Sequence, residues 1–351
     1  METFNQALRF VPQSRNIMLS ALTLGLQAAG LLLTPLTWAW SGWAFAGWLL
    51  VYGYATILCW LMIHEAVHYK LLHDRRANIA LGRALAITFG CPFHILKIGH
   101  MSHHRYNRGS LDSNELVPAN AQPFALYWLA YYGRILGALY LAEVIVPLVF
   151  FFWKRFMRLA DRWSQGGALS ATIRLFTRRL VHTVQFDAVL CTALFAAQIW
   201  CNHADIVPFI ILFGWRAFIV SFYDNAYHYG NDPSDVHAAN NLSVPGFLQH
   251  AILNHNLHRL HHRYPTASWA LLPDFARRDA EGFDAPLVTT IWRQIKGPVR
   301  RTTQDSTSHS HVKNQRSDFA AADSPVASHP HDSARIVANP TANSAADSPP
   351  T

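Results

Sequence analysis

Four long apolar runs alternate with short polar segments along the chain, at residues 16–38, 43–63, 186–200 and 206–221. Each run is near the length that a helix needs to cross about 30 Å of hydrocarbon at 1.5 Å per residue. Only a few residues separate the first run from the second, and the third from the last. The pattern therefore predicts an all-α integral membrane protein with about four transmembrane helices, arranged in two hairpins.

Two further apolar segments are less regular, and both are predicted to lie at the membrane interface. Residues 124–153 are rich in aromatic side chains but include Arg134 and Glu143, which favours an interfacial helix or a re-entrant hairpin over a lipid-exposed span. Two short crossings are the alternative. Residues 81–98 are interrupted at 90–92 by a glycine and a proline, and are interpreted in the same way.

Composition and charge agree with a membrane protein and predict its orientation. The chain is 51% hydrophobic and 14% charged, whereas ordinary soluble domains carry about 25% charged residues. Residues 65–123 and 154–185 contain seven Lys or Arg each, and more follow residue 224, whereas the short turns at 39–42 and 201–205 have none. By the positive-inside rule, both termini and the basic segments are predicted to be cytoplasmic. A nucleic-acid partner is not expected on so apolar a chain.

Histidines form three groups whose spacing fits one face of a helix. They are the pair His64 and His68, the run "HMSHH", and the run "NHNLHRLHH". Residues at i, i+3 and i+4 share a helix face, so each group can present its imidazoles in one direction. The predicted topology places all three groups on the same side of the membrane, where they can converge into one site.

Eight of these imidazoles, all except that of His255, exceed what one ion needs, since a structural zinc takes four ligands and a catalytic zinc three plus water. Two ions of five or six coordination could use all eight and keep open positions. The spacing therefore predicts a centre of two metals. Neutral imidazoles suit iron, copper, nickel or zinc, so the spacing leaves the metal open.

The ordered histidine groups resemble those of the membrane fatty acid desaturase superfamily, which are diiron enzymes. The resemblance covers about residues 17–298 and rests on "HEAVH", "HMSHH" and "NLHRLHHRYPTASWALLP". It implies two iron ions, dioxygen as co-substrate and no catalytic residue beyond the metal centre. It further implies desaturation of a fatty acyl chain, carried as an acyl-lipid or an acyl thioester. The metal ligands that it implies are His64, His68, His100, His103, His104, His258, His261 and His262.

Members of the superfamily usually draw a further ligand from the segment before the third histidine group. The segment "DNAYHYGND" follows the last predicted crossing, and His228 is the candidate. Other residues beside the groups are expected to support the ligands without binding metal. These are Glu65, Asp224, Asn225, His255 and Asn256.

The resemblance divides the chain into three parts. Residues 1–16 are a cytoplasmic N-terminus, residues 17–301 a desaturase-like membrane domain with a cytoplasmic diiron site, and residues 302–351 a polar tail predicted to be disordered from its Ser, Ala, Asp and Pro content. The absence of a fused electron-transfer domain or a retrieval signal favours a bacterial inner membrane.

Two electrons per turnover must come from outside, because the chain has neither a haem-binding His-Pro-Gly-Gly signature nor an iron–sulfur cysteine pattern. The predicted donor is a separate ferredoxin-like or cytochrome protein, docked on a basic face that includes Arg75, Arg76, Arg105 or Arg259. Membrane lipids are the other expected partner.

Three other functions remain open on the sequence. The same diiron site could serve an acyl hydroxylase, a ketolase or an acetylenase. A membrane zinc metallopeptidase would use His64 and His68 as ligands and Glu65 as general base, but it leaves the other two histidine groups unexplained. A metal transporter is disfavoured because the predicted crossings contain almost no acidic residues.

Overall fold

The structure is a computed structural model, and it describes most of the chain up to residue 301. The predicted disordered tail, residues 302–351, lies outside the described residues, and so does the very start of the cytoplasmic segment 1–16. The described residues are 6–108, 112, 115–156, 158, 173–231 and 238–301.

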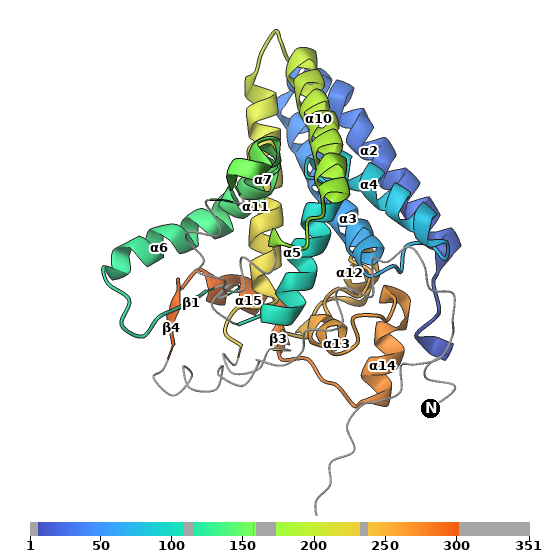
Figure 1. Ribbon diagram of the computed structural model, residues 1–351, viewed down its shortest axis with the longest axis vertical. Helices are drawn as coiled ribbons and strands as arrows, with labels where there is room; N and C mark the ends of the chain where they lie inside the picture. The colour runs from blue at the N-terminus through green and yellow to red at the C-terminus, as the bar shows by residue number, and fades with distance from the viewer. Residues whose placement is uncertain are drawn as a thin grey trace, which may run out of the picture. The chain divides into compact units, whose positions relative to one another are not determined.

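The described residues are overwhelmingly helical, with four two-residue strands, so the predicted fold class is confirmed. Long helices form two hairpins as predicted (Figure 1). In the first hairpin, Ser41 separates the two helices and its Oγ accepts a hydrogen bond from Ala44 N, which caps the second helix. The four helices are α2 (Gln13–Trp40), α3 (Gly42–Val67), α10 (Arg178–Cys201) and α11 (Val207–Ala226).

The number of helices able to cross a membrane is five, or up to six, among the described residues, so the predicted count of four is not established. The fifth candidate is Phe124–Phe156, and the sixth is a bent pair, α4 (Arg75–Phe89) with α5 (Phe93–Tyr106). Large apolar side chains remain exposed on the long helices, for example Leu50 and Trp43 on α3, as expected for surfaces that face lipid.

The bent pair contains the segment 81–98, which the sequence predicted to lie at the membrane interface. The chain turns by 97° between α4 and α5, at the glycine and proline that interrupt the apolar segment 81–98. Gly90 has a φ of 100°, and a Cβ there would lie 2.7 Å from the Phe195 ring. A Cβ on Gly82 would lie 2.8 Å from Ala66 Cβ, so α4 packs tightly against α3. Helix α4 therefore packs into the bundle, although its first two residues, Arg75 and Arg76, are exposed.

Residues 124–152 form a bent helix that begins beside the histidine-rich end of the bundle. It comprises α6 (Phe124–Gly133), a π-helical turn (Arg134–Ala138) with Gly137 at φ 141°, α7 (Leu139–Val149) and a 3₁₀ turn (Phe150–Phe152). In α6, Tyr131 donates a hydrogen bond of 2.7 Å to Gln294 O, and Tyr132 donates one of 2.6 Å to Ile295 O. These contacts with the C-terminal helices fit the predicted interfacial placement of α6, although length and composition also allow a crossing.

Short elements after residue 238 gather at one end of the bundle (Figure 1). The parallel strand pair β2 with β3 joins two parts of this region, and the parallel pair β1 with β4 joins it to residues 116–117. We call this C-terminal region, residues 238–301, the cap. Its helices are α12 (Gly246–Ala251), α13 (His258–Arg263), the 3₁₀ turn Trp269–Leu271, α14 (Leu272–Arg278) and α15 (Leu287–Gln294). The strands are β1 (Leu116–Val117), β2 (Leu242–Ser243), β3 (Ala285–Pro286) and β4 (Val299–Arg300).

A buried arginine joins the bundle helices. Arg216 of α11 is 2% exposed and donates a 2.6 Å hydrogen bond to Tyr52 Oη of α3. It also donates to Tyr140 Oη of α7, to Gln27 Oε1 of α2, and to Phe89 O at the end of α4. A charge this deep is costly unless it is hydrogen-bonded, and these partners hold four other helices around α11.

Candidate metal centre

All nine histidines predicted as ligands lie at the junction of the bundle and the cap. His64 and His68 lie at the end of α3, three more lie on the last two turns of α5, three on α13, and His228 directly after α11. The helical spacing of each group turns its imidazoles inward, as the sequence predicted. The structure brings them into two groups, each with its candidate ligand atoms within 4.8 Å of one another.

The first group contains five histidines from all three sequence motifs. Their Nε2 atoms form a chain of close contacts, with distances of 3.0 Å for His64 to His261, 3.0 Å for His261 to His104, 3.0 Å for His104 to His100 and 2.9 Å for His100 to His68. Four of these five side chains are buried, and His104 is partly buried.

The second group contains four histidines. The Nε2 atoms of His103 and His262 are 3.2 Å apart, and those of His228 and His258 are 3.0 Å apart. His228 therefore lies among the candidate ligands, as the segment before the third motif predicted. The helix register explains how two motifs serve both groups. On α5, His100 and His104 face the first group and His103 the second, whereas on α13, His261 faces the first group and the other two the second.

Hydrogen bonding among the imidazoles cannot account for the first group. Each Nε2 has a single in-plane site, which is either one hydrogen or one lone pair. Five such atoms can form at most two hydrogen bonds, yet four contacts of 2.9–3.0 Å link them. A cation among five lone pairs would satisfy every ring, so the donor set fits a metal that favours imidazole.

Burial keeps the imidazoles of His68, His228, His258 and His261 in the neutral form that binds metal. Removal from water is the largest cause that lowers the pKa of His258 and His261 well below the usual value, and the neighbouring imidazoles lower both further. Removal from water is also the largest cause that lowers the pKa of His68 and the pKa of His228. Neutral rings at pH 7 need lose no proton before they bind a cation.

Asp112 orients a histidine of the second group, a role that no sequence motif indicates. Its Oδ2 accepts a hydrogen bond from Nδ1 of His103. Burial alone would raise the pKa of Asp112, but the His103 ring and this hydrogen bond lower it. A carboxylate at Nδ1 places the lone pair of His103 on Nε2, toward the other ligand atoms, an arrangement common around metal-bound histidines.

A fully buried ion pair holds the segment that carries His228. Arg108 Nη1 lies 3.0 Å from Glu115 Oε1, and both side chains are 0% exposed. The same nitrogen donates a 3.0 Å hydrogen bond to His228 O. Glu115 Oε1 also accepts from Gly230 N at 2.8 Å. The pair therefore fixes the backbone on both sides of the histidine that follows α11.

Two of the five predicted supporting residues lie against the histidines. Glu65 Oε1 is 3.9 Å from His64 Nδ1, and Glu65 Oε2 accepts a 3.4 Å hydrogen bond from Trp269 N in the cap. His255 packs against the His258 ring at 4.6 Å between centroids, and its Nδ1 lies 3.3 Å from Tyr223 Oη.

The other three are used differently. Asp224 lines a cavity beside the site and lies 3.8 Å from Arg134 Nη2. Asn225 bonds to Tyr131 Oη and Gln294 Oε1, and thus joins α11 to α6 and α15. Asn256 donates to Leu242 O and so holds the strand β2. For the two asparagines, the described hydrogen bonds support the cap and not the histidine rings.

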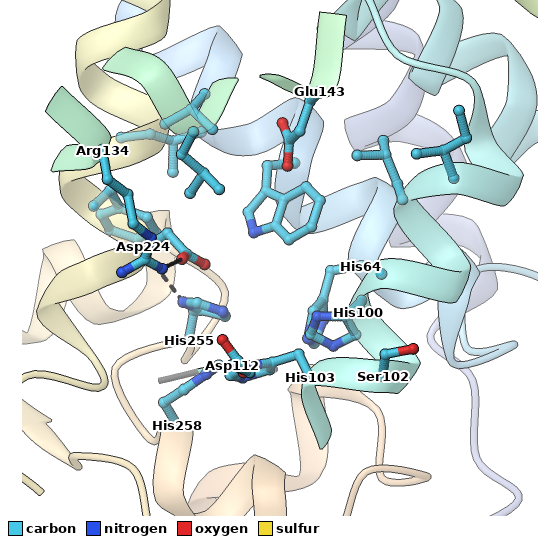
Figure 2. Close-up of a pocket in the computed structure, with 18 of the residues that line it drawn as sticks. His64, His100, Ser102, His103, Asp112, Arg134, Glu143, Asp224, His255 and His258 are labelled. Atoms are coloured by element: carbon cyan, nitrogen blue, oxygen red, sulfur yellow. Dashed lines mark hydrogen bonds and ion pairs between the residues drawn. The ribbon is translucent and has the colours of Figure 1, made fainter. Parts of the chain in front are cut away.

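A cavity of about 370 Å³ opens from the histidines into the bundle, at the small end of the usual 300–1,000 Å³ for ligand pockets. Figure 2 shows His64, His100, His103 and His258 along one side of it. Apolar side chains supply most of the remaining wall, and the Trp60 ring packs 6.0 Å from His100. These apolar lining residues are Ile57, Trp60, Ile95, Leu96, Leu139, Ile219 and Val220.

A family model, fatty acid desaturase, matches residues 38–294, well over half of the chain. Searches of curated proteins and of solved structures returned no match. The family indicates an oxidoreductase of the desaturase or hydroxylase kind with iron-dependent catalysis, and the two histidine groups could hold metal ions. The matched region spans the histidines of both groups and confirms the resemblance noted in their motifs. The chain belongs to the fatty acid desaturase family.

Proposed function

We propose that the protein is an oxygen-dependent diiron desaturase that introduces a double bond into a fatty acyl chain, carried as an acyl-lipid or an acyl thioester. The observation that carries this proposal is the pair of histidine groups, five and four side chains, at the end of an apolar cavity. Two redox-active ions with unfilled coordination positions fit these donor sets, and an acyl chain fits the apolar wall of the cavity.

The residues that would hold the two irons follow from the grouping. The first iron would lie among His64, His68, His100, His104 and His261, and the second among His103, His228, His258 and His262. When bound, the irons would supply the activation of dioxygen that C–H oxidation requires, which redox-inactive zinc cannot supply.

The protein itself would orient the ligands and the substrate. Asp112 holds the His103 ring in one tautomer. Trp60 packs against both His64 and His100, at 6.4 and 6.0 Å between ring centroids, and shields that side of the site. The apolar wall would exclude water and fix which carbon of a chain lies nearest the histidines, and such positioning is a large part of catalysis.

Expression in a desaturase-deficient host tests the proposal. A new double bond in the lipids, lost in His104→Ala and in His261→Ala, is the expected result. Asp274→Asn, at an exposed position of α14, is a matched control that should retain activity. Unchanged lipids in a host where the protein carries two irons per chain would refute the proposed substrate.

An acyl hydroxylase, a ketolase or an acetylenase would use the same ligands, so the outcome must be measured. Purified protein is supplied with a defined acyl substrate, a reductant and labelled dioxygen. Plain desaturation leaves no label in the lipid product, whereas incorporation of the label would replace desaturation with oxygen insertion.

A zinc metallopeptidase built on His64, Glu65 and His68 is disfavoured by the geometry. Both histidines share their group with three more imidazoles, and Glu65 accepts from the Trp269 backbone. Metal analysis separates the two functions, because one zinc and no iron per chain would refute the diiron proposal.

The electron donor is proposed to be a separate ferredoxin-like or cytochrome protein at a cytoplasmic surface, in a bacterial inner membrane. Among the arginines expected there, Arg259 is engaged within the cap, 2.6 Å from Glu281 Oε2 and hydrogen-bonded to Asp284. The Arg75 guanidinium packs over the Tyr69 ring at 4.4 Å. Charge reversal at Arg76 should raise the donor concentration needed for half-maximal lipid desaturation. If desaturation depends on donor concentration as in wild type, the donor does not dock at this surface.

A further inference from the structure

Glu143 is a carboxylate in an otherwise apolar helix. It lies in α7, whose sequence is LYLAEVIVPLV. Its Oε2 is buried and has no hydrogen-bond partner among the described residues. Burying a carboxyl group without a partner costs several kcal/mol in an apolar environment. Such a group in a membrane helix therefore calls for a ligand or another function.

Glu143 lines the cavity beside the metal centre. Figure 2 shows its carboxylate reaching into the cavity from α7, across the open space from His64 and His100. The apolar residues Leu139, Ile219 and Val220 line the same cavity. The cavity thus has a histidine end, an apolar wall and a single carboxylate at the far side.

The other charged groups of the cavity have partners of their own. Asp112 accepts from His103. Arg134 Nη1 donates a 3.0 Å hydrogen bond to Asn225 Oδ1, and its Nη2 lies 3.8 Å from Asp224. Within the described part of the chain, Glu143 is the charged lining residue for which no such partner is present.

We propose that Glu143 binds a hydroxyl group of the substrate, and that the substrate is a hydrocarbon chain that carries this hydroxyl. The proposal rests on the function proposed above and narrows its substrate class. A hydroxyl can donate to a carboxylate, and it can also pair with a neutral carboxylic acid. With its hydroxyl held at Glu143, the hydrocarbon chain would lie at a fixed position in the cavity. That position would determine which of its carbons is nearest the histidines.

Electrostatics disfavours the carboxylate of a free fatty acid at this position. Glu143 and Asp224 line the same cavity, and a third negative charge would be repelled by both. An ammonium group would be attracted by Glu143 and Asp224, but moving its charge from water to a mostly apolar wall would cost free energy. A neutral donor gains the hydrogen bond without transferring a charge from water.

Binding without turnover provides the test. The full-length, iron-loaded protein in nanodiscs is kept without reductant, and competition by dodecanol, dodecane, dodecylammonium and dodecanoate is measured against a photoreactive dodecanol. Dodecanol should bind wild type about 10- to 100-fold more tightly than it binds Glu143→Leu, the usual range for a hydrogen bond to a charged group. Dodecane should bind both proteins equally, and Glu143→Gln, whose amide is a neutral acceptor, should bind dodecanol with an affinity between those of wild type and Glu143→Leu. Asp274→Asn is the control.

Equal binding of dodecanol and dodecane to wild type would overturn the proposal, as would full affinity for dodecanol in Glu143→Leu. Tighter binding of dodecylammonium than of dodecanol would replace the hydroxyl with an amine and so refute it as well. Iron content and thermal unfolding establish that each variant is folded. Because no turnover is involved, a failure here leaves the diiron desaturase proposal intact, and a failure of that proposal appears separately in metal analysis and lipid profiles.

Discussion

The link between Asp112 and His103 allows one metal site to be weakened selectively. Asp112→Asn keeps the size of the side chain but removes the negative charge that accepts from His103 Nδ1. The amide can still offer its oxygen, so the ring can stay in place with a less basic Nε2. The change touches only the second group, because Asp112 is hydrogen-bonded to no histidine of the first in the described residues.

Loss of such a supporting carboxylate typically costs 10- to 100-fold in metal affinity or activity, which corresponds to about 1.4–2.7 kcal/mol. We therefore expect Asp112→Asn to lose one iron of two at a chelator concentration about 10- to 100-fold below that needed for wild type. The first group, with five imidazoles of its own, should retain its iron.

Iron per chain is measured by metal analysis during chelator titration of purified protein, with Asp274→Asn as the control. Two double variants assign the lost iron. Asp112→Asn should cause little further iron loss in His258→Ala, because both changes act on the second group. In His68→Ala, which acts on the first group, it should cause its full iron loss. Equal chelator resistance of Asp112→Asn and wild type, or the reverse pattern in the double variants, would refute the reasoning.

Three further predictions concern Glu65, Arg216 and Glu115. Glu65→Ala should weaken activity, whereas His68→Ala should abolish it with part of the iron; a fully iron-loaded but inactive Glu65→Ala would show instead that this carboxylate is catalytic. Arg216→Met should lower the unfolding temperature in detergent, because each buried group that loses its donor costs about 1–3 kcal/mol, whereas exposed Arg277→Met should not; equal temperatures would contradict the network. Glu115→Gln should destabilise the fold by about 3–5 kcal/mol, as for breaking a buried ion pair, and an unchanged denaturation midpoint would argue against it.

Local periodicity was sufficient to predict four long helices and the three histidine groups, whereas His228 was predicted from the resemblance to the family. The helix-face spacing from His100 to His104 acts within one turn, so it is readable without tertiary information. The division of nine imidazoles into groups of five and four depends on how α3, α5 and α13 are rotated about their axes. That rotation is set by packing, for example by Gly82 against Ala66, and not by the motifs.

Residues that act through distant contacts were the ones that sequence reasoning missed or misplaced. Asp112 follows its histidine by nine positions in a polar segment with no recognisable motif. Asn225 has the expected position beside His228, but its amide is used by Gln294, 69 residues away. Residues 81–98 were predicted to be interfacial because a glycine and a proline interrupt them, and the ion pair of Arg83 with Asp187 of α10, at 2.5 Å, could not be predicted from that pattern.

The distance along the chain between facing ligands sets the order of events during biosynthesis. His64 and His261 lie 3.0 Å apart in space and 197 residues apart in sequence. Chains fold from the N-terminus as they are made, so α3 is complete long before α13 has been translated. Neither group can close before the cap docks, because both contain histidines of α13. Under the diiron proposal, iron would therefore be bound only after synthesis has passed the third histidine motif.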